Sequence, residues 1–201
     1  MPARRARHRT RQVIDTALQF LADEANAHLL RRTGSELGAV TPGTVVDDAG
    51  RWTGPMDTTR LLMFQVEEER ALRSQLPERT LVGGREVSLP PPLRLNLVLL
   101  FAGRFQQYGT AMRTLSHLMA FFQARPVFSA AESPDLPPGV ERLTMELLSW
   151  GPEQVSQMWS AIGARQLPSV LYRLRMVVLQ DSEPQGTGLP ITVIQASVGG
   201  R

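Results

Sequence analysis

Apolar residues recur along the chain with two different periods, and these periods predict where helices and strands lie. From residue 10 to residue 32 the apolar positions are three and four residues apart, which predicts one long helix. Its apolar stripe is formed by Ile14, Leu18, Leu21, Ala25 and Leu29. Thr10 suits the start of this helix and Gly34 its end. Residues 1–9 show no such period, so we expect a flexible basic arm there.

The second half of the chain alternates between the two periods. A period of two at residues 93–101 and 142–147 is typical of strands. Between them lies the apolar stripe of a helix, formed by Phe105, Tyr108, Met112, Leu115, Met119 and Phe122, with Thr110, Arg113, Thr114 and His117 on its polar side. Pro152 begins a shorter helix that Gly163 ends, and residues 170–179 form a further long strand.

The region between the first helix and residue 93 is less regular. Residues 34–60 are rich in Gly, Thr, Asp and Pro, which predicts a loop with one short strand near Val45 and Val46. The apolar run 61–66 predicts a strand buried on both faces, and Gly83-Gly84 marks the turn of a hairpin excursion. Together these elements predict an α+β fold, a mixed β-sheet packed with one long N-terminal helix and two further helices. The predicted organisation is the arm 1–9, a single domain 10–180, and a hinge with a strand-like C-terminal arm 181–201.

Composition narrows the class of protein. No stretch has the roughly 20 apolar residues of a membrane helix, and no apolar segment follows the basic N-terminus as in a secretion signal. We therefore expect a soluble protein made in the cytosol, with no membrane partner. Cysteine is absent, which excludes disulfides and thiolate chemistry.

Charge is concentrated at the N-terminus. All 22 basic residues are arginines, and Arg4, Arg5, Arg7, Arg9 and Arg11 lie in the first eleven residues without an acid. Since the net charge of the whole chain is +3, the remainder of the chain carries −2. The basic segment fits either nucleic acid, through counterion release, or a partner protein. Without interleaved aromatic residues the nucleic-acid interpretation is the weaker of the two.

The sequence offers little catalytic chemistry. The three histidines, His8, His28 and His117, share no metal-ligand spacing, and His117 is interpreted as a surface residue rather than an active-site base. Phosphate-binding loops and nucleophile elbows are absent. The acidic run 67–69 is interpreted as a solvated or salt-bridged strand end rather than a metal site. We predict no catalytic residues, no metal and no cofactor.

Two features instead suggest contact with partners. Arg173 and Arg175 lie on one face of a strand whose other face is apolar, which indicates either a solvated sheet face or pairing with acids of a neighbouring subunit. The segment 191–198 is uncharged and rich in β-branched residues. If it projects from the body it is suited to strand addition through Ile191, Val193 and Ile194; if it folds back it is only the last edge strand.

The ordered pattern of residues 96–177 resembles a known family. NLVLLFAGRFQQYGTAMRTLSHLMAFFQARPVF (96–128) and LTMELLSWGPEQVSQMWSAIGARQLPSVLYRLRMV (143–177) resemble the cap proteins of extracellular contractile injection systems, such as the antifeeding prophage and the Photorhabdus virulence cassettes. Upstream, LQFLADEANAHL and VEEERALR are similar to the family's first helix and its acid-rich strand end. The resemblance spans about residues 12 to 180 in register.

This resemblance implies a structural tail terminator rather than an enzyme. Its fold would be the α/β-type terminator fold, a mixed sheet with helices packed on it. Six copies are expected to form a ring that ends the inner tube and anchors the distal sheath. The expected partners are therefore other copies of the chain, the inner-tube protein and the sheath protein. The protein would be assembled in the bacterial cytoplasm and then remain in the injection particle. The alternative is a nucleic-acid-binding module that acts through the basic N-terminal arm.

Overall fold

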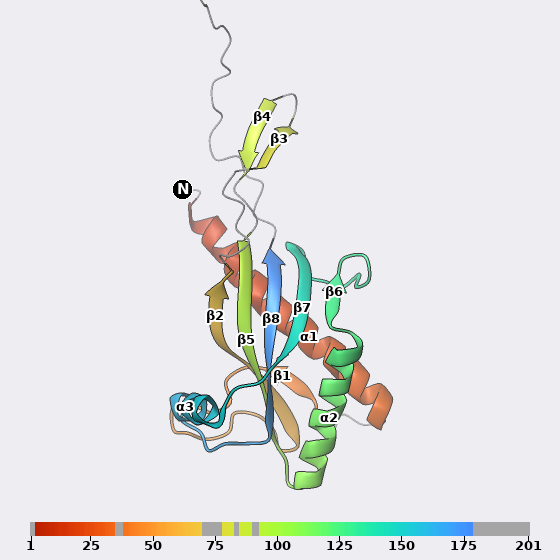
Figure 1. Cartoon of the computed structure of the whole chain (residues 1–201), viewed down its shortest axis with the longest axis vertical. Helices are drawn as coiled ribbons and strands as arrows, with labels where there is room; N and C mark the ends of the chain where they lie inside the picture. The colour runs from red at the N-terminus through yellow and green to blue at the C-terminus, as the bar shows by residue number, and fades with distance from the viewer. Residues whose placement is uncertain (1–2, 35–37, 70–77, 83–84, 90–92, 179–201) are drawn as a thin grey trace, which may run out of the picture.

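The body of the protein is one six-stranded sheet with three helices packed against it (Figure 1). The computed structural model describes residues 3–34, 38–69, 78–82, 85–89 and 93–178. The helices are α1 (Ala3–Thr33), α2 (Tyr108–Ala124) and α3 (Pro152–Ile162). The strands are β1 (Val40–Pro42), β2 (Thr58–Glu68), β3 (Glu78–Val82), β4 (Arg85–Leu89), β5 (Leu93–Arg104), β6 (Val127–Ser129), β7 (Val140–Leu148) and β8 (Ser169–Val178).

The main sheet has six strands in the order β1-β2-β5-β8-β7-β6. Only β1 and β2 pair in parallel, and the other neighbours are antiparallel. β5 and β8 are the long central strands, paired from Leu93↔Val178 to Ala102↔Ser169. β3 and β4 form a separate two-stranded hairpin, as the Gly83-Gly84 turn predicts. The mixed sheet with one long N-terminal helix and two further helices confirms the predicted fold class.

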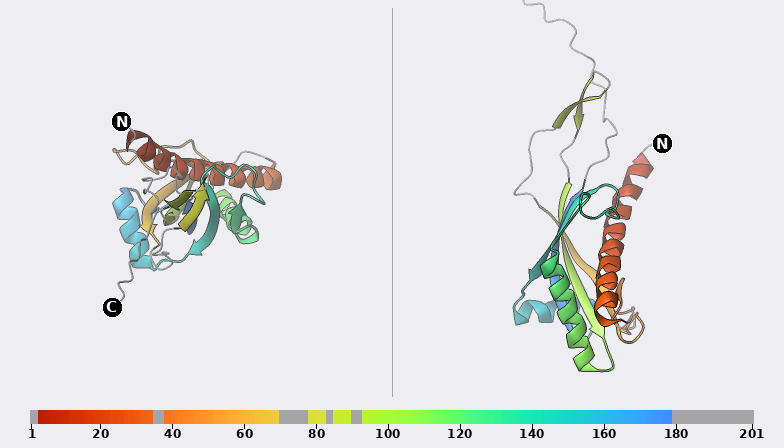
Figure 2. Two further views of the ribbon diagram at one scale, coloured as in Figure 1. Left: turned by 90° about the horizontal axis from the view of Figure 1, so that it is seen from above. Right: turned by 90° about the vertical axis from the view of Figure 1, so that its right-hand side faces the viewer.

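α1 and α2 cover one face of the sheet (Figure 2). The main hydrophobic core lies between these two helices and the sheet. α1 contributes the predicted stripe, with Leu21 and Ala25 fully buried and Ile14 partly buried against the core. Aromatic rings fill the centre, where Phe101 lies 5.5 Å from Phe122 and 5.8 Å from Tyr172 between ring centroids. Burial of Tyr172 raises the pKa of its hydroxyl to about 12.

A second, smaller core lies on the opposite face under α3 and the loop 43–55. Met158 and Trp159 of α3 are buried there with Val98, Leu100 and Leu171 of the sheet. α3 begins at Pro152 and ends at Gly163, whose φ of 76° is the left-handed helix cap that glycine favours. Both boundaries are those predicted from the sequence.

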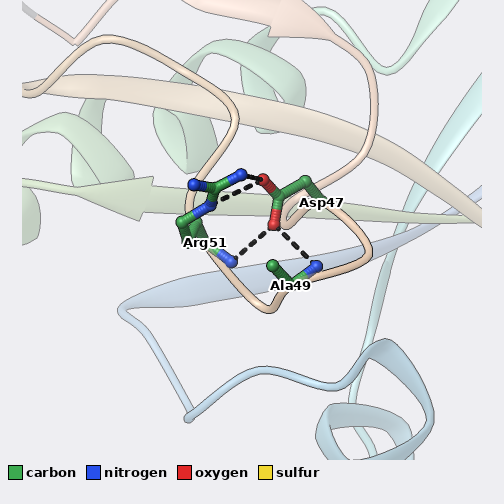
Figure 3. Close-up of polar contacts among 3 residues, drawn as sticks. All are labelled: Asp47, Ala49 and Arg51. Atoms are coloured by element: carbon green, nitrogen blue, oxygen red, sulfur yellow. Dashed lines mark hydrogen bonds and ion pairs between the residues drawn. The ribbon is translucent and has the colours of Figure 1, made fainter.

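Asp47 organises the loop that packs beside α3. Its carboxylate accepts hydrogen bonds from the backbone N–H groups of Ala49 and Arg51 and pairs with the Arg51 guanidinium at 2.9 Å (Figure 3). These bonds, first the one from the Arg51 backbone, lower the pKa of the Asp47 carboxyl. The ordered turn brings Val45 and Trp52 of the same loop against the second core.

The predicted start of the first helix is wrong. α1 begins at Ala3 instead of Thr10, so it includes most of the segment that we expected to be a flexible arm. The physical reason is that Arg and Ala are good helix formers, and a helix turn outside the core needs no apolar period. The division of the chain into an arm, a domain and a C-terminal arm stays a prediction, since residues 179–201 lie outside the described part.

The predicted apolar stripe of α2 is turned from the face that the helix buries. Tyr108 is 72% exposed and Met119 37% exposed, whereas Thr110 and Thr114 are buried. Phe105 precedes the helix altogether. Thr114 packs against Gly38 so closely that a Cβ added to Gly38 would lie 2.6 Å from the Thr114 Cγ2 atom, a contact that only glycine allows.

The short edge strands were not predicted in their right places. Val46 forms only an isolated bridge with Trp52, while the edge strand β1 lies earlier, at Val40–Pro42. It is fixed by Asn26 of α1, whose side chain bonds both the N–H and the C=O of Val40 at 2.7 and 2.8 Å. The short edge strand β6 was not predicted either. The run 61–66 forms a strand, as predicted: Leu61 and Met63 pack into the main core and Leu62 into the second core. Its end is not buried, since Val66 is 42% exposed.

Candidate assembly interface

Within the described ranges, the face of the sheet opposite α1 and α2 is only partly covered, by α3 and the loop 43–55. Strand register defines rows of side chains that cross this face. The row under α3 is apolar and consists of Leu62, Leu100, Leu171 and Leu148. The next two rows are mostly polar and contain Gln65, Val98, Arg173 and Glu146, then Glu67, Asn96, Arg175 and Thr144. We call these two rows the polar face of the sheet.

Polar contacts between described residues orient side chains of the polar face. Arg175 Nε pairs with Glu146 Oε1 at 3.0 Å, with both side chains well exposed. Asn96 Nδ2 donates to Glu69 Oε2 at 2.9 Å, and Gln65 Nε2 donates to Glu67 Oε1 at 2.8 Å. The Arg175–Glu146 ion pair, at this exposure, contributes about 0–1 kcal/mol. Such contacts set the direction of the side chains more than they stabilise the fold.

Arg173 is the unmatched cation of the polar face. It lies between Val98 and Glu146 in register, is partly buried, and makes no hydrogen bond or ion pair with any residue that the structure describes. Glu146, its neighbour in the row, pairs with Arg175 instead. A guanidinium held in this way can bond a carboxylate of another molecule in bidentate geometry. Of the two predicted interface arginines, the structure therefore leaves Arg173 available and gives Arg175 an acid of its own chain.

The acidic run at the end of β2 does not converge on one point. Glu67 and Glu69 bond side chains of the polar face, whereas Glu68 pairs in register with Leu95 of the α1 side. Alternation along a strand sends successive side chains to opposite faces. Within the described ranges, no three His, Asp or Glu side chains gather closely enough to hold a metal ion.

Part of β2 lies at an edge of the described sheet. β1 pairs only with Thr59–Leu61, so among the described strands none pairs with residues 62–67 on the side away from β5. Such an edge offers unpaired N–H and C=O groups to an added strand. The predicted donor residues Ile191, Val193 and Ile194 lie outside the described residues.

His28 of α1 and His117 of α2 lie on the helix-covered side of the sheet, away from the polar face. The His28 ring lies 4.9 Å from Phe121 between centroids. Partial burial, followed by the charges of Arg32, Arg31 and His117, lowers the pKa of His28. His117 is partly buried. Neither histidine forms a hydrogen bond with a carboxylate in the described part of the chain.

The sequence could not identify the polar partners on this face. Glu146 stands in a predicted strand, but its pairing with Arg175 depends on the antiparallel register of β7 and β8, which sequence alone does not give. The available signal was an acid, Glu146, within one predicted strand and two arginines within another. The same holds for Asn96 and Glu69.

Solved structures with the same fold come from contractile injection systems. One is the sheath/tube terminator of an extracellular contractile injection system, PVC, in its extended state, with a TM-score of 0.56 and 14% identity over 89% of this chain. Another is the tube-terminating cap of the anti-feeding prophage, also with a TM-score of 0.56 and 14% identity, over 88% of this chain. The chain spans 63% and 59% of the lengths of these two proteins. The fold is therefore that of tube and sheath terminators.

The family follows from the sequence itself. The model of the Pvc16 N-terminal domain matches residues 14–193, which is most of the chain, and the protein belongs to this family. The match confirms the family resemblance inferred from residues 96–177. No protein of curated description matches the sequence significantly. The helices in the described part are too short or too polar to cross a lipid bilayer.

Proposed function

We propose that this protein is a structural cap that terminates the tube and sheath of an extracellular contractile injection system. The observation that carries the proposal is the family match over residues 14–193, supported by a fold shared with two such terminators. The chain acts through its surfaces, so the proposed role is structural rather than enzymatic.

The proposed cap is a ring of six copies placed on the last ring of the inner tube. Its partners are the tube protein, whose growth it stops, and the sheath protein, whose distal end it holds. In this arrangement the polar face and the edge of β2 are surfaces that remain for partners after α1, α2 and α3 have covered the rest of the sheet. The protein is made in the bacterial cytoplasm and stays in the finished particle.

Electron microscopy of particles from cells that lack this gene tests the proposed function. We expect tubes of variable length without a cap, and contracted or detached sheaths, because nothing then ends polymerisation at a fixed point. Complementation with the full chain should restore uniform capped particles. Capped particles of uniform length in the deletion strain would falsify the proposal.

We further propose that residues 191–198 add as a strand to a sheath subunit and that Arg173 and Arg175 bind acidic residues of a partner. Removal of residues 183–201 should leave a cap that assembles on the tube but no longer retains the sheath, measured as the fraction of sheathed particles. Arg173→Glu should reduce sheathing or cap occupancy, with exposed Arg165→Glu as the control. Normal particles with the truncated chain would rule out strand addition, and normal particles with Arg173→Glu would rule out the arginine contact.

A further inference from the structure

A groove on the outer side of α1 combines an apolar floor with unpaired acids. It measures about 540 Å³ and lies between α1 and the loop 129–139. Phe20, Ala27, Pro137 and Pro138 supply its apolar surface. Thr16, Gln19, Asp23, Glu24 and Asp135 supply its polar surface. We call it the α1 groove.

The acids of the α1 groove differ in their partners. Glu24 is paired with Arg125, so its charge is neutralised. Asp23 accepts a hydrogen bond from Gln19 Nε2 at 2.9 Å but has no cation, and Asp135 is exposed and has no ion pair within the described ranges. The groove therefore carries two uncompensated negative charges beside proline and aromatic surface. That combination suits arginine, whose flat guanidinium packs on apolar surface while it bonds carboxylates.

The complementary segment is the N-terminal third of α1 itself. The sequence places five arginines and no acid in residues 1–11, and the helix is continuous from Ala3 to Thr33. Positions 4, 7 and 11 are three and four residues apart, which is the spacing of one helix face. At 1.5 Å per residue they span roughly 10 Å, which fits within the roughly 16 Å between positions 16 and 27 along the groove.

The geometry excludes docking of this segment within one chain. The arginines and one wall of the groove belong to the same continuous helix, which cannot fold back on itself. Figures 1 and 2 show the N-terminal end of α1 standing clear of the strands near β2, whereas the loop 129–139 lies at the β6 side of the sheet. A contact between these two different places on successive copies is head-to-tail, the kind that closes into rings.

We infer that the basic N-terminal segment of one copy docks in the α1 groove of the next copy and joins the subunits of the cap ring. This inference rests on the proposed ring and names the contact that builds it. A nucleic acid is a poorer occupant of the groove, since its phosphates would meet Asp23 and Asp135. In the ring, the basic segment binds the neighbouring copy and is not available to bind nucleic acid.

Charge exchange in the full chain tests the inference. The double variant Asp23→Arg/Asp135→Arg should raise the apparent Kd of self-association by at least about tenfold, since unlike charges across an interface become like charges. The triple variant Arg4→Glu/Arg7→Glu/Arg11→Glu should have a similar effect. An equimolar mixture of the two variants should recover self-association, because copies that alternate around the ring place opposite charges across every contact. One chain that carries all five changes should recover it as well, because its acidic segment meets a basic groove at each contact. Mass photometry and light scattering over a concentration series give the measurement.

Two controls separate this contact from other effects. Asp48→Arg changes an exposed acid in the loop beside α3, outside the groove, and should leave self-association unchanged. Self-association of the wild-type chain should weaken with salt, because exposed ion pairs are screened over about 10 Å at 0.1 M. Thermal denaturation of each variant shows whether it is folded.

Several outcomes overturn the inference. They are a monomeric wild type at all concentrations, unchanged self-association in the folded double or triple variant, or no recovery in the fivefold variant. Loss of nucleic-acid binding alone in the triple variant would assign the basic segment to nucleic acid instead. In each of these cases the cap function stays open to the gene-deletion test, so the two proposals fail separately.

Discussion

Phe101→Ala is expected to lower the free energy of unfolding by about 3–5 kcal/mol, a large share of the roughly 5–15 kcal/mol of a typical domain. Phe101 is fully buried in the second half of β5. Its ring contacts Phe122 of α2 and Tyr172 of β8, so it joins the helix layer to the central strand pair. Truncation leaves a cavity among rigid neighbours and removes two aromatic contacts, each worth about 0.5–1.5 kcal/mol beyond area burial.

Urea denaturation followed by circular dichroism measures this loss as a shift of the midpoint. Tyr108→Ala is the matched control, because it removes an aromatic ring that is 72% exposed and should change stability by no more than about 0.5 kcal/mol. Equal losses in the two variants would show that the Phe101 cluster is not the centre of the core. In the assembled particle, the Phe101 variant should also reduce the number of capped tubes, since less folded protein is available.

The sequence predicted best those helices and strands whose apolar residues all pack against one neighbouring layer of the fold, because their apolar period is then visible in the sequence. β5 and β8 bury their Leu95 and Leu174 faces against the helices, so a period of two is visible in the sequence. α1 buries a continuous apolar stripe. α3 carries its own stop signals at Pro152 and Gly163.

The elements that sequence missed depend on distant contacts. Asn26 of α1 holds β1 in place by hydrogen bonds to both backbone groups of Val40. No residue close to Val40 in the sequence indicates that contact. α2 buries Thr114 against Gly38, a contact between distant parts of the chain that the apolar pattern of the helix does not show. The arginines of the polar face were predicted, but the unequal partnering of Arg173 and Arg175 follows from strand register.

Arg125→Ala is expected to cost about 2–3 kcal/mol of stability, because it leaves a buried hydroxyl and a carboxylate without their partner. Arg125 follows α2 and reaches three elements at once. It pairs with Glu24 of α1, donates to Ser133 Oγ at 2.8 Å and lies over the Phe128 ring at 4.7 Å. The guanidinium is about one-third exposed, so solvent reduces the ion pair's share. Most of the loss comes from Ser133, which is 2% exposed, and from the ring contact.

Substitution by lysine separates charge from geometry at this position. Arg125→Lys keeps the positive charge but has one nitrogen where the guanidinium offers several, so it cannot bond Glu24, Ser133 and the Glu132 carbonyl together. We expect an intermediate loss in the same urea titration, while exposed Arg165→Ala should change little. A lysine variant as stable as wild type would mean that charge alone matters. Because Arg125 fixes the loop that carries Asp135, both variants should also weaken the self-association attributed to the α1 groove, by more in Arg125→Ala than in Arg125→Lys.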